Sequence, residues 1–145
     1  MPELDYAVLC DYVRTEGGLA HVIAAGVDTI FAPEVPAGQN LGFLMRIAFA
    51  RTECGRPHRV EVIFQDEDGE RLTEISGLLS PEWQDGLPAG WRVGAMMGLN
   101  IGVPLPRFGL YSFEVLLNGN QVKTIPLRVL QRELPGAPPE SEPGE

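Results

Sequence analysis

The chain has 145 residues and a formal net charge of −9, with 44% hydrophobic and 21% charged residues. This length suffices for one domain whose core needs no disulfide or metal to hold it together. The negative charge disfavours nucleic acid and anionic membrane surfaces as partners, because both carry the same sign of charge. Seventeen glycines and thirteen prolines favour tight turns over long helices.

Short runs of alternating apolar and polar residues recur along the chain, and period-two alternation predicts β-strands. The runs are residues 4–13, 19–31, 41–51, 59–65, 71–79 and 93–103, followed by two arms of a hairpin within 110–130. Gly26, inside the second run, indicates a bulge or bend. Eight short strands separated by turns predict an all-β fold, an antiparallel β-sandwich, with a partly closed β-barrel as the alternative.

The final hairpin turns at Asn118-Gly119-Asn120, which lies between two alternating runs. We expect a three-residue loop that pairs Leu117 with Gln121 and Phe113 with Ile125. This register keeps the apolar residues of both arms on one face of the sheet, whereas a slip of one residue would separate them.

The ordered domain is expected to span residues 1–132. Residues 133–145 are rich in proline, glutamate and glycine, and we expect this acidic tail to be disordered. The first residues show neither a basic segment nor a long apolar segment, and no apolar run approaches the length of a membrane span. The two cysteines, Cys10 and Cys54, lie in unrelated contexts and are expected to be reduced, which favours a cytoplasmic location.

Three segments carry a resemblance to a known family: LDYAVLCDYVRTEGGLAHVIAAGVDTI, HRVEVIFQDEDGERL and YSFEVLLNGNQVKTIPLRV. Together they resemble an uncharacterised family of small soluble bacterial proteins, largely actinobacterial, known as a domain of unknown function. The resemblance covers roughly residues 3–130 and implies a small β-rich domain. It implies no activity and no functional residue.

Acidic residues cluster at Asp66-Glu67-Asp68-Gly69-Glu70, where the D-x-D-G order is similar to the opening of a calcium-binding loop. The later ligands of such a loop are missing. Acidic residues and glycine between two alternating runs are also typical of a hairpin turn. The turn is therefore the favoured interpretation, with Asp66, Asp68 and Glu70 as a weak candidate cation site. We predict no cofactor.

Two cysteines and two histidines, Cys10, His21, Cys54 and His58, match the ligand set of a structural zinc site. However, the chain has no CxxC motif, and Cys10 shares a strand face with apolar residues. The four residues are explained without a metal if Cys10 is a buried core residue, His21 lies on a strand, and Cys54 and His58 belong to a turn.

Catalytic motifs are missing, because the chain has two histidines and no G-x-S-x-G nucleophile motif. We therefore assign no catalytic residue and favour a protein that is not an enzyme. Carboxylates on the first two runs, Asp5, Asp11 and Asp28, leave an alternative open. That alternative is a domain that binds or hydrolyses a small ligand, such as a sugar or polar metabolite.

Aromatic and methionine residues gather around the long segment 80–92 and the run after it, as Trp83, Trp91, Met96 and Met97. Such residues are enriched at protein interfaces, and loops on a rigid scaffold often carry binding residues. The leading hypothesis is a non-catalytic binding or assembly module that contacts a protein partner or itself through these residues. For these residues themselves, the favoured interpretation is a loop that folds back so that its tryptophans cap one open end of the sandwich, and an interface is the alternative. An edge strand also offers a route to a homodimer.

Three glycines, Gly94, Gly98 and Gly102, recur every four residues in the run 93–103 and share one strand face. Without side chains, that face offers a shallow groove or a flat surface. Another part of the domain or a partner could approach it.

Overall fold

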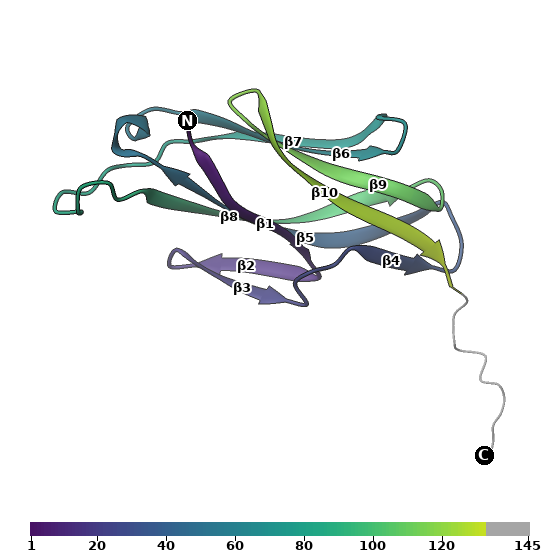
Figure 1. The fold of residues 1–145 in the computed structure, drawn as a ribbon. Coiled ribbons are helices and arrows are strands. Elements are labelled where there is room, and N and C mark those ends of the chain that lie inside the picture. Colours follow the sequence, from purple (N-terminus) through teal and green to yellow (C-terminus); the bar gives the residue numbers. More distant parts are fainter. Residues whose placement is uncertain (133–145) are drawn as a thin grey trace, which may run out of the picture.

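The computed structural model describes residues 1–132, which contain ten strands and one 3₁₀ helix (Figure 1). The elements are β1 (Glu3–Cys10), β2 (Tyr12–Glu16), β3 (Leu19–Ile23), β4 (Thr29–Ala32), β5 (Ala37–Phe49), η1 (Arg51–Glu53), β6 (His58–Asp66), β7 (Arg71–Leu79), β8 (Val93–Leu105), β9 (Gly109–Leu117) and β10 (Asn120–Gln131). No helix in this range is long and apolar enough to cross a membrane. The predicted disordered tail, 133–145, lies outside the described residues.

The strands form three sheets in residues 1–132, with orders β1-β5-β8, β4-β10-β9-β6-β7 and β2-β3. The first two pack face to face, which confirms the predicted all-β sandwich. One pair departs from the antiparallel expectation, because β4 runs parallel to β10.

Ten strands replace the predicted eight because two predicted strands each divide. The first divides at Asp11, between β1 and β2. The second divides between β3 and β4, where Ala24 and Gly26 have φ angles of 57° and 100°. The expected bend at Gly26 is thus a full interruption, since left-handed residues cannot continue a strand.

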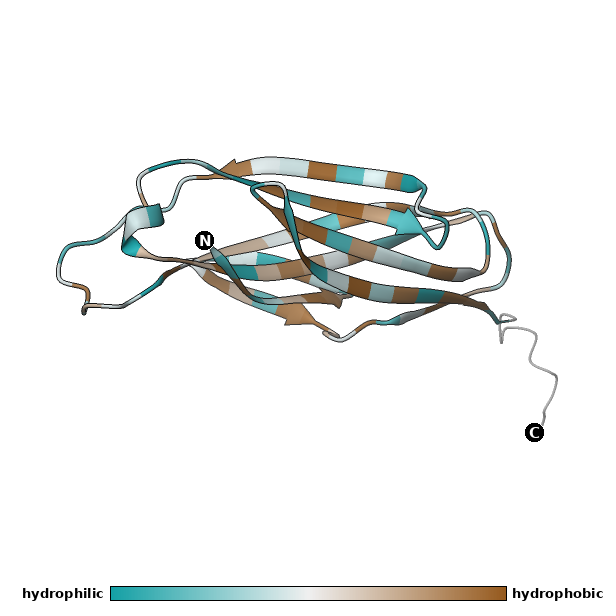
Figure 2. Ribbon diagram, turned by 45° about the horizontal axis from the view of Figure 1, so that its top comes forward, coloured by the Kyte–Doolittle hydropathy of each residue, from teal (hydrophilic) through white to brown (hydrophobic). Residues whose placement is uncertain are grey.

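The core lies between the two larger sheets and is built from apolar residues of both. Figure 2 shows hydrophobic and hydrophilic positions alternating along the strands. Phe43 on β5, Phe64 on β6 and Phe113 on β9 are each at most 1% exposed. The Phe113 ring lies 5.6 Å from that of Phe43 and 4.8 Å from that of Phe64. The contact between Phe43 and Phe113 joins the two sheets, whereas Phe64 and Phe113 are paired on neighbouring strands of one sheet.

The β9–β10 hairpin confirms the predicted pairing of Phe113 with Ile125 but not the three-residue loop. Leu117 pairs with Asn120, and the register shifts between Gln121 and Lys123, so the predicted Leu117–Gln121 pair is wrong. Asn118 and Gly119 have φ angles of 50° and 83°. An Asn-Gly pair with positive φ at both residues makes a two-residue turn. The following bulge then restores the matching of apolar faces.

The small β2–β3 sheet covers part of the glycine-bearing face of β8. A Cβ at Gly98 would lie 3.1 Å from methyl groups of both Val13 and Thr15 on β2. The side chain of Asn100 fixes the same contact. The Val13 N–H donates to Asn100 Oδ1 at 3.1 Å, and Asn100 Nδ2 donates to the Val13 carbonyl at 2.8 Å. The glycine face is therefore approached by a segment of the same chain.

Candidate functional site

The connection between β7 and β8, residues 80–92, forms an open pocket of about 520 Å³ with η1 at one end of the sandwich. We call this connection the Trp loop and the hollow the Trp pocket. The pocket is lined by Ala50, Arg51, Trp83, Leu87, Ala89, Gly90, Trp91 and Arg92. Gly90 has a φ of 80°, and the Trp91 N–H donates to the Pro88 carbonyl at 3.1 Å. This tight turn returns the chain so that both indoles face one hollow.

The two indoles differ in exposure and in their neighbours. Trp91 is 54% exposed. Trp83 is half-buried, and the Arg51 guanidinium lies 5.3 Å from its ring centroid. Arg51 forms no ion pair within residues 1–132. The pocket thus presents one exposed indole beside a cation–π pair, with no carboxylate in its lining.

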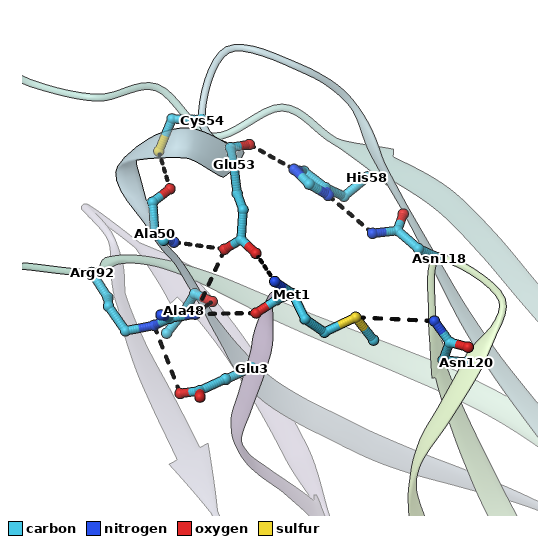
Figure 3. Close-up of polar contacts among 10 residues, drawn as sticks. All are labelled: Met1, Glu3, Ala48, Ala50, Glu53, Cys54, His58, Arg92, Asn118 and Asn120. Atoms are coloured by element: carbon cyan, nitrogen blue, oxygen red, sulfur yellow. Dashed lines mark hydrogen bonds and ion pairs between the residues drawn. The ribbon is translucent and has the colours of Figure 1, made fainter.

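A buried polar cluster centred on Glu53 includes Arg92 and Ala50, which also line the pocket (Figure 3). Glu53 is 3% exposed, and its Oε1 accepts a hydrogen bond from the Ala50 N–H at 2.7 Å. Its carboxylate also pairs with the α-amino group of Met1 and, at 3.6 Å, with Arg92 Nη2. Burial raises the pKa of Glu53, but these hydrogen bonds and charges outweigh burial and hold the pKa below its ordinary value.

Arg92 belongs both to this cluster and to the pocket lining. Its Nη2 donates to the carbonyls of Ala48 at 3.2 Å and Met1 at 3.3 Å. Its Nε is buried and has no hydrogen-bond partner among residues 1–132, and Glu3 Oε1 lies 3.7 Å from it. Because Arg92 directly follows Trp91, these contacts fix the point from which the exposed indole projects.

His58 is buried beside the cluster and serves as a structural residue. Its Nε2 lies 2.6 Å from the Glu53 carbonyl, so this nitrogen carries the hydrogen. Its Nδ1 then accepts from Asn118 Nδ2 at 3.1 Å. The ring packs against Phe49 with centroids 4.8 Å apart. Both nitrogens are occupied, although a hollow of about 390 Å³ lies nearby, between Met1 and Asn118.

The structure separates the two methionines from the two tryptophans of the predicted surface. Met96 and Met97 are consecutive on β8, so they point to opposite faces of the sheet. Met97 packs against the main core, whereas Met96 packs on the outer face and accepts a hydrogen bond from the Tyr6 hydroxyl at 3.7 Å. Neither lines the Trp pocket. The structure brings Trp83 and Trp91 together and adds two residues that the sequence analysis missed, Arg51 and Arg92.

Asp66, from the candidate cation site, braces the β6–β7 turn. Its Oδ1 accepts the N–H groups of Asp68 and Glu70, both at 2.9 Å, and its Oδ2 lies 2.9 Å from Arg107 Nη2. The Glu70 N–H, together with the Asp68 N–H and Arg107, lowers the pKa of Asp66. In the part of the chain that the structure describes, no three His, Cys, Asp or Glu side chains are grouped to hold a metal. The favoured interpretation, a hairpin turn, accounts for Asp66 and Asp68.

The zinc-like set is dispersed over the fold. Cys10 is fully buried in a small cluster with Val13 and Leu44, whereas His21 is exposed on β3. The Cys54 thiol donates to the Ala50 carbonyl at 3.4 Å. Packing and local hydrogen bonds account for these thiols.

The three candidate carboxylates lie apart from the Trp pocket. Asp5 pairs with Arg46, Asp28 accepts a hydrogen bond from the Thr29 hydroxyl at 2.9 Å, and Asp11 is exposed between β1 and β2. None of them lines the pocket.

The fold and its site define a class: a two-sheet β-sandwich with an aromatic pocket on the loop at one end. The chain belongs to a family described as "Family of unknown function (DUF6941)", which matches residues 5–130. This match confirms the resemblance to a family of unknown function. A comparison with curated proteins gave no match.

Two solved structures align with this chain at low sequence identity. A glycosyl hydrolase family 2 member from Bacteroides cellulosilyticus aligns with a TM-score of 0.52 and 11% identity, over 88% of this chain and 15% of the hydrolase chain. This chain therefore spans a small part of that enzyme's length. The C-terminal domain of Wzt aligns with a TM-score of 0.49 and 13% identity, over 90% of this chain and 74% of that chain. At such identities the likeness concerns the fold alone.

Proposed function

We propose that this protein is a non-catalytic binding module that engages a protein partner through the Trp pocket. The observation that carries the proposal is the presence, in one open hollow, of two indoles and the guanidinium of Arg51, which forms no ion pair within residues 1–132. Tryptophan and arginine are the residue types that most often dominate the free energy of protein–protein binding.

The exposure of Trp91 and the contacts that hold its neighbour favour binding over a simple cap on the sandwich. A capping tryptophan would be buried, but Trp91 is 54% exposed. Its neighbour Arg92 is held by Glu53 and by the carbonyl groups of Ala48 and Met1. An exposed side chain on a fixed base loses little conformational freedom on binding, and this pre-organisation favours affinity.

Neither methionine lines the Trp pocket. Met96 is half-buried beside Tyr6 on the outer face of β8, and Met97 packs against the core. The proposed contact surface therefore consists of the Trp pocket without the two methionines. The proposal includes a cytoplasmic location, which the free thiols of Cys10 and Cys54 support.

A small polar ligand, such as a sugar, is the second candidate for the same pocket. A volume of about 520 Å³ lies within the range of small-molecule sites, and indole faces stack on sugar rings. Hydrolysis of a glycoside requires two carboxyl groups flanking the bond, and none lines this pocket. This second candidate is therefore binding without hydrolysis.

The test compares three tagged forms of the protein in its own host: wild type, Trp91→Ala and Leu78→Ala. Leu78 is a matched control, because it is 68% exposed and lies on β7, outside the lining of the Trp pocket. Quantitative mass spectrometry should find a partner retained by wild type and Leu78→Ala and lost from Trp91→Ala. With that partner purified, Trp91→Ala should weaken binding about tenfold or more, which corresponds to about 1.4 kcal/mol.

Equal recovery of every partner by a folded Trp91→Ala protein would refute the proposal. A small molecule that raises the Tm of wild type but not of Trp91→Ala would instead support the second candidate, since a ligand specific for the native state stabilises it.

A further inference from the structure

The two edges of the β2–β3 sheet are not equivalent. The N–H and carbonyl of Val13 on β2 bind the side chain of Asn100, so these groups point away from β3. Val13 and its partner Val22 are therefore a non-hydrogen-bonded pair of the ladder. The pair Thr15–Ala20, two positions along, follows the same pattern. The backbone N–H and carbonyl groups of Ala20 and Val22 consequently face the other side of β3, which is the outer edge.

This outer edge of β3 is open. No other strand in residues 1–132 pairs with it, and Figure 1 shows β3 at the margin of the molecule, outside β2. Proteins commonly protect an edge strand with proline, lysine or a β-bulge. The sequence of β3, LAHVI, contains neither proline nor lysine. Its pairing with β2 has no register shift, so it has no β-bulge. By contrast, the edge strand β1 has a register shift between Leu4 and Tyr6.

The outward side chains of β3 are apolar on both sides of His21. Leu19 is 69% exposed and Ile23 is 57% exposed. The charges on the facing strand, Arg14 and Glu16, pair with each other at 3.4 Å. The hairpin therefore has little net charge of its own, although the whole chain carries −9. Repulsion between two copies is weakest at such a neutral element.

We infer that β3 is the pairing edge of a symmetric homodimer, in which two copies join antiparallel about a two-fold axis at His21. In this register Ala20 forms a hydrogen-bonded pair with Val22 of the partner subunit, and Val22 does the same with Ala20 of the partner subunit. Leu19 then faces Ile23 of the partner subunit, and His21 faces the partner's His21. Two marginal two-stranded sheets become one sheet of four strands. This inference is independent of the proposed function of the Trp pocket.

Disulfide trapping tests the register directly. In a non-hydrogen-bonded antiparallel pair the two Cα atoms are about 4.5 Å apart, which a disulfide can bridge. In a Cys54→Ser background, His21→Cys should form a covalent dimer under mild oxidation. Leu19→Cys should not, because its two copies would lie roughly 13 Å apart along the paired strands. A mixture of Leu19→Cys and Ile23→Cys proteins should cross-link.

A failure of His21→Cys to cross-link, or equal cross-linking of Leu19→Cys alone, would overturn this register. The dimer itself is tested by sedimentation velocity over a wide concentration range. Wild type and Leu78→Lys should shift to the dimer mass as concentration rises, whereas Ile23→Lys should remain monomeric with an unchanged melting transition. Wild type that stays monomeric at every concentration, or Ile23→Lys that associates like wild type, would refute the inference.

Discussion

The side-chain amide of Asn100 on β8 binds both backbone polar groups of Val13 on β2, as a neighbouring strand would. Together with the packing of Val13 and Thr15 against Gly98, this contact attaches the β2–β3 hairpin to the sandwich, and it covers one of the hairpin's two edges. It also determines which backbone groups of β3 face outward. The orientation of the hairpin therefore depends on a residue far away in the sequence.

Replacement of Asn100 by alanine should loosen the hairpin, because it leaves the Val13 N–H and carbonyl without partners. We expect the free energy of unfolding to fall by about 1–3 kcal/mol. Hydrogen exchange of β2 and β3 amides should accelerate more than exchange of core amides. Asn40→Ala, at an exposed asparagine on β5, is the control and should change neither quantity. Unaltered exchange in the hairpin of Asn100→Ala would contradict this account.

A side chain at Gly98 should push the hairpin away from β8, since its Cβ would meet two methyl groups at 3.1 Å. We expect Gly98→Val to lower the free energy of unfolding by about 1–3 kcal/mol, as overpacking commonly does. Gly77→Val on β7 is a matched control, because nothing lies within 4 Å of a Cβ there. Urea unfolding measures the stability of both variants. Similar unfolding midpoints for Gly98→Val and Gly77→Val would argue against close packing at Gly98.

Asp66 should make the free energy of unfolding depend on pH in the acidic range. Hydrogen bonds from the N–H groups of Glu70 and Asp68 and the charge of Arg107 lower its pKa in the folded state. The stabilisation that ionised Asp66 gives to the folded state is therefore fully present above the ordinary pKa of an aspartate, about 3.9. It is lost as the pH falls through the lower pKa that Asp66 has in the folded protein. Asp66→Asn should be less stable than wild type at neutral pH, and this difference should shrink in acid. Asp85→Asn, in the exposed Trp loop, should follow the wild-type profile.

Glu53 should determine how firmly the Trp loop is held. In Glu53→Leu the Arg92 guanidinium loses its carboxylate and the Ala50 N–H loses its acceptor. We expect a loss of about 1–3 kcal/mol in the free energy of unfolding and faster hydrogen exchange in the Trp loop. Glu82→Gln, at an exposed residue, is the control. If Glu53→Leu unfolds without any separate loosening of the Trp loop, Glu53 supports the domain and not the pocket.

The sequence predicted the sandwich because period-two alternation directly reflects burial on one strand face. It did not predict the path of each turn. The Asn118-Gly119 pair shows why: two positive φ angles and a bulge beyond Gln121 reconcile a two-residue loop with the matched faces. Ala24 shows the same limit, since alanine gives no signal for a left-handed residue that ends a strand.

The candidate site was predicted in part. Trp83 and Trp91 line one pocket because both belong to one loop, whereas the sequence indicated only that they gather around that loop. Met96 and Met97 do not join them, and the alternation along β8 already separates their faces. Arg51 reaches Trp83 only through the packing of η1 against the Trp loop, which no local pattern encodes. Such contacts between distant segments require the fold itself.

The most direct test of the binding proposal is photo-crosslinking in the protein's own host, with a photoreactive amino acid in place of Trp91. The control carries the same amino acid in place of Leu78, which is exposed on β7. The proposal predicts a discrete cross-linked partner from position 91 and none from position 78. No cross-linked species at position 91, or the same species from both positions, would contradict a partner site at the Trp pocket.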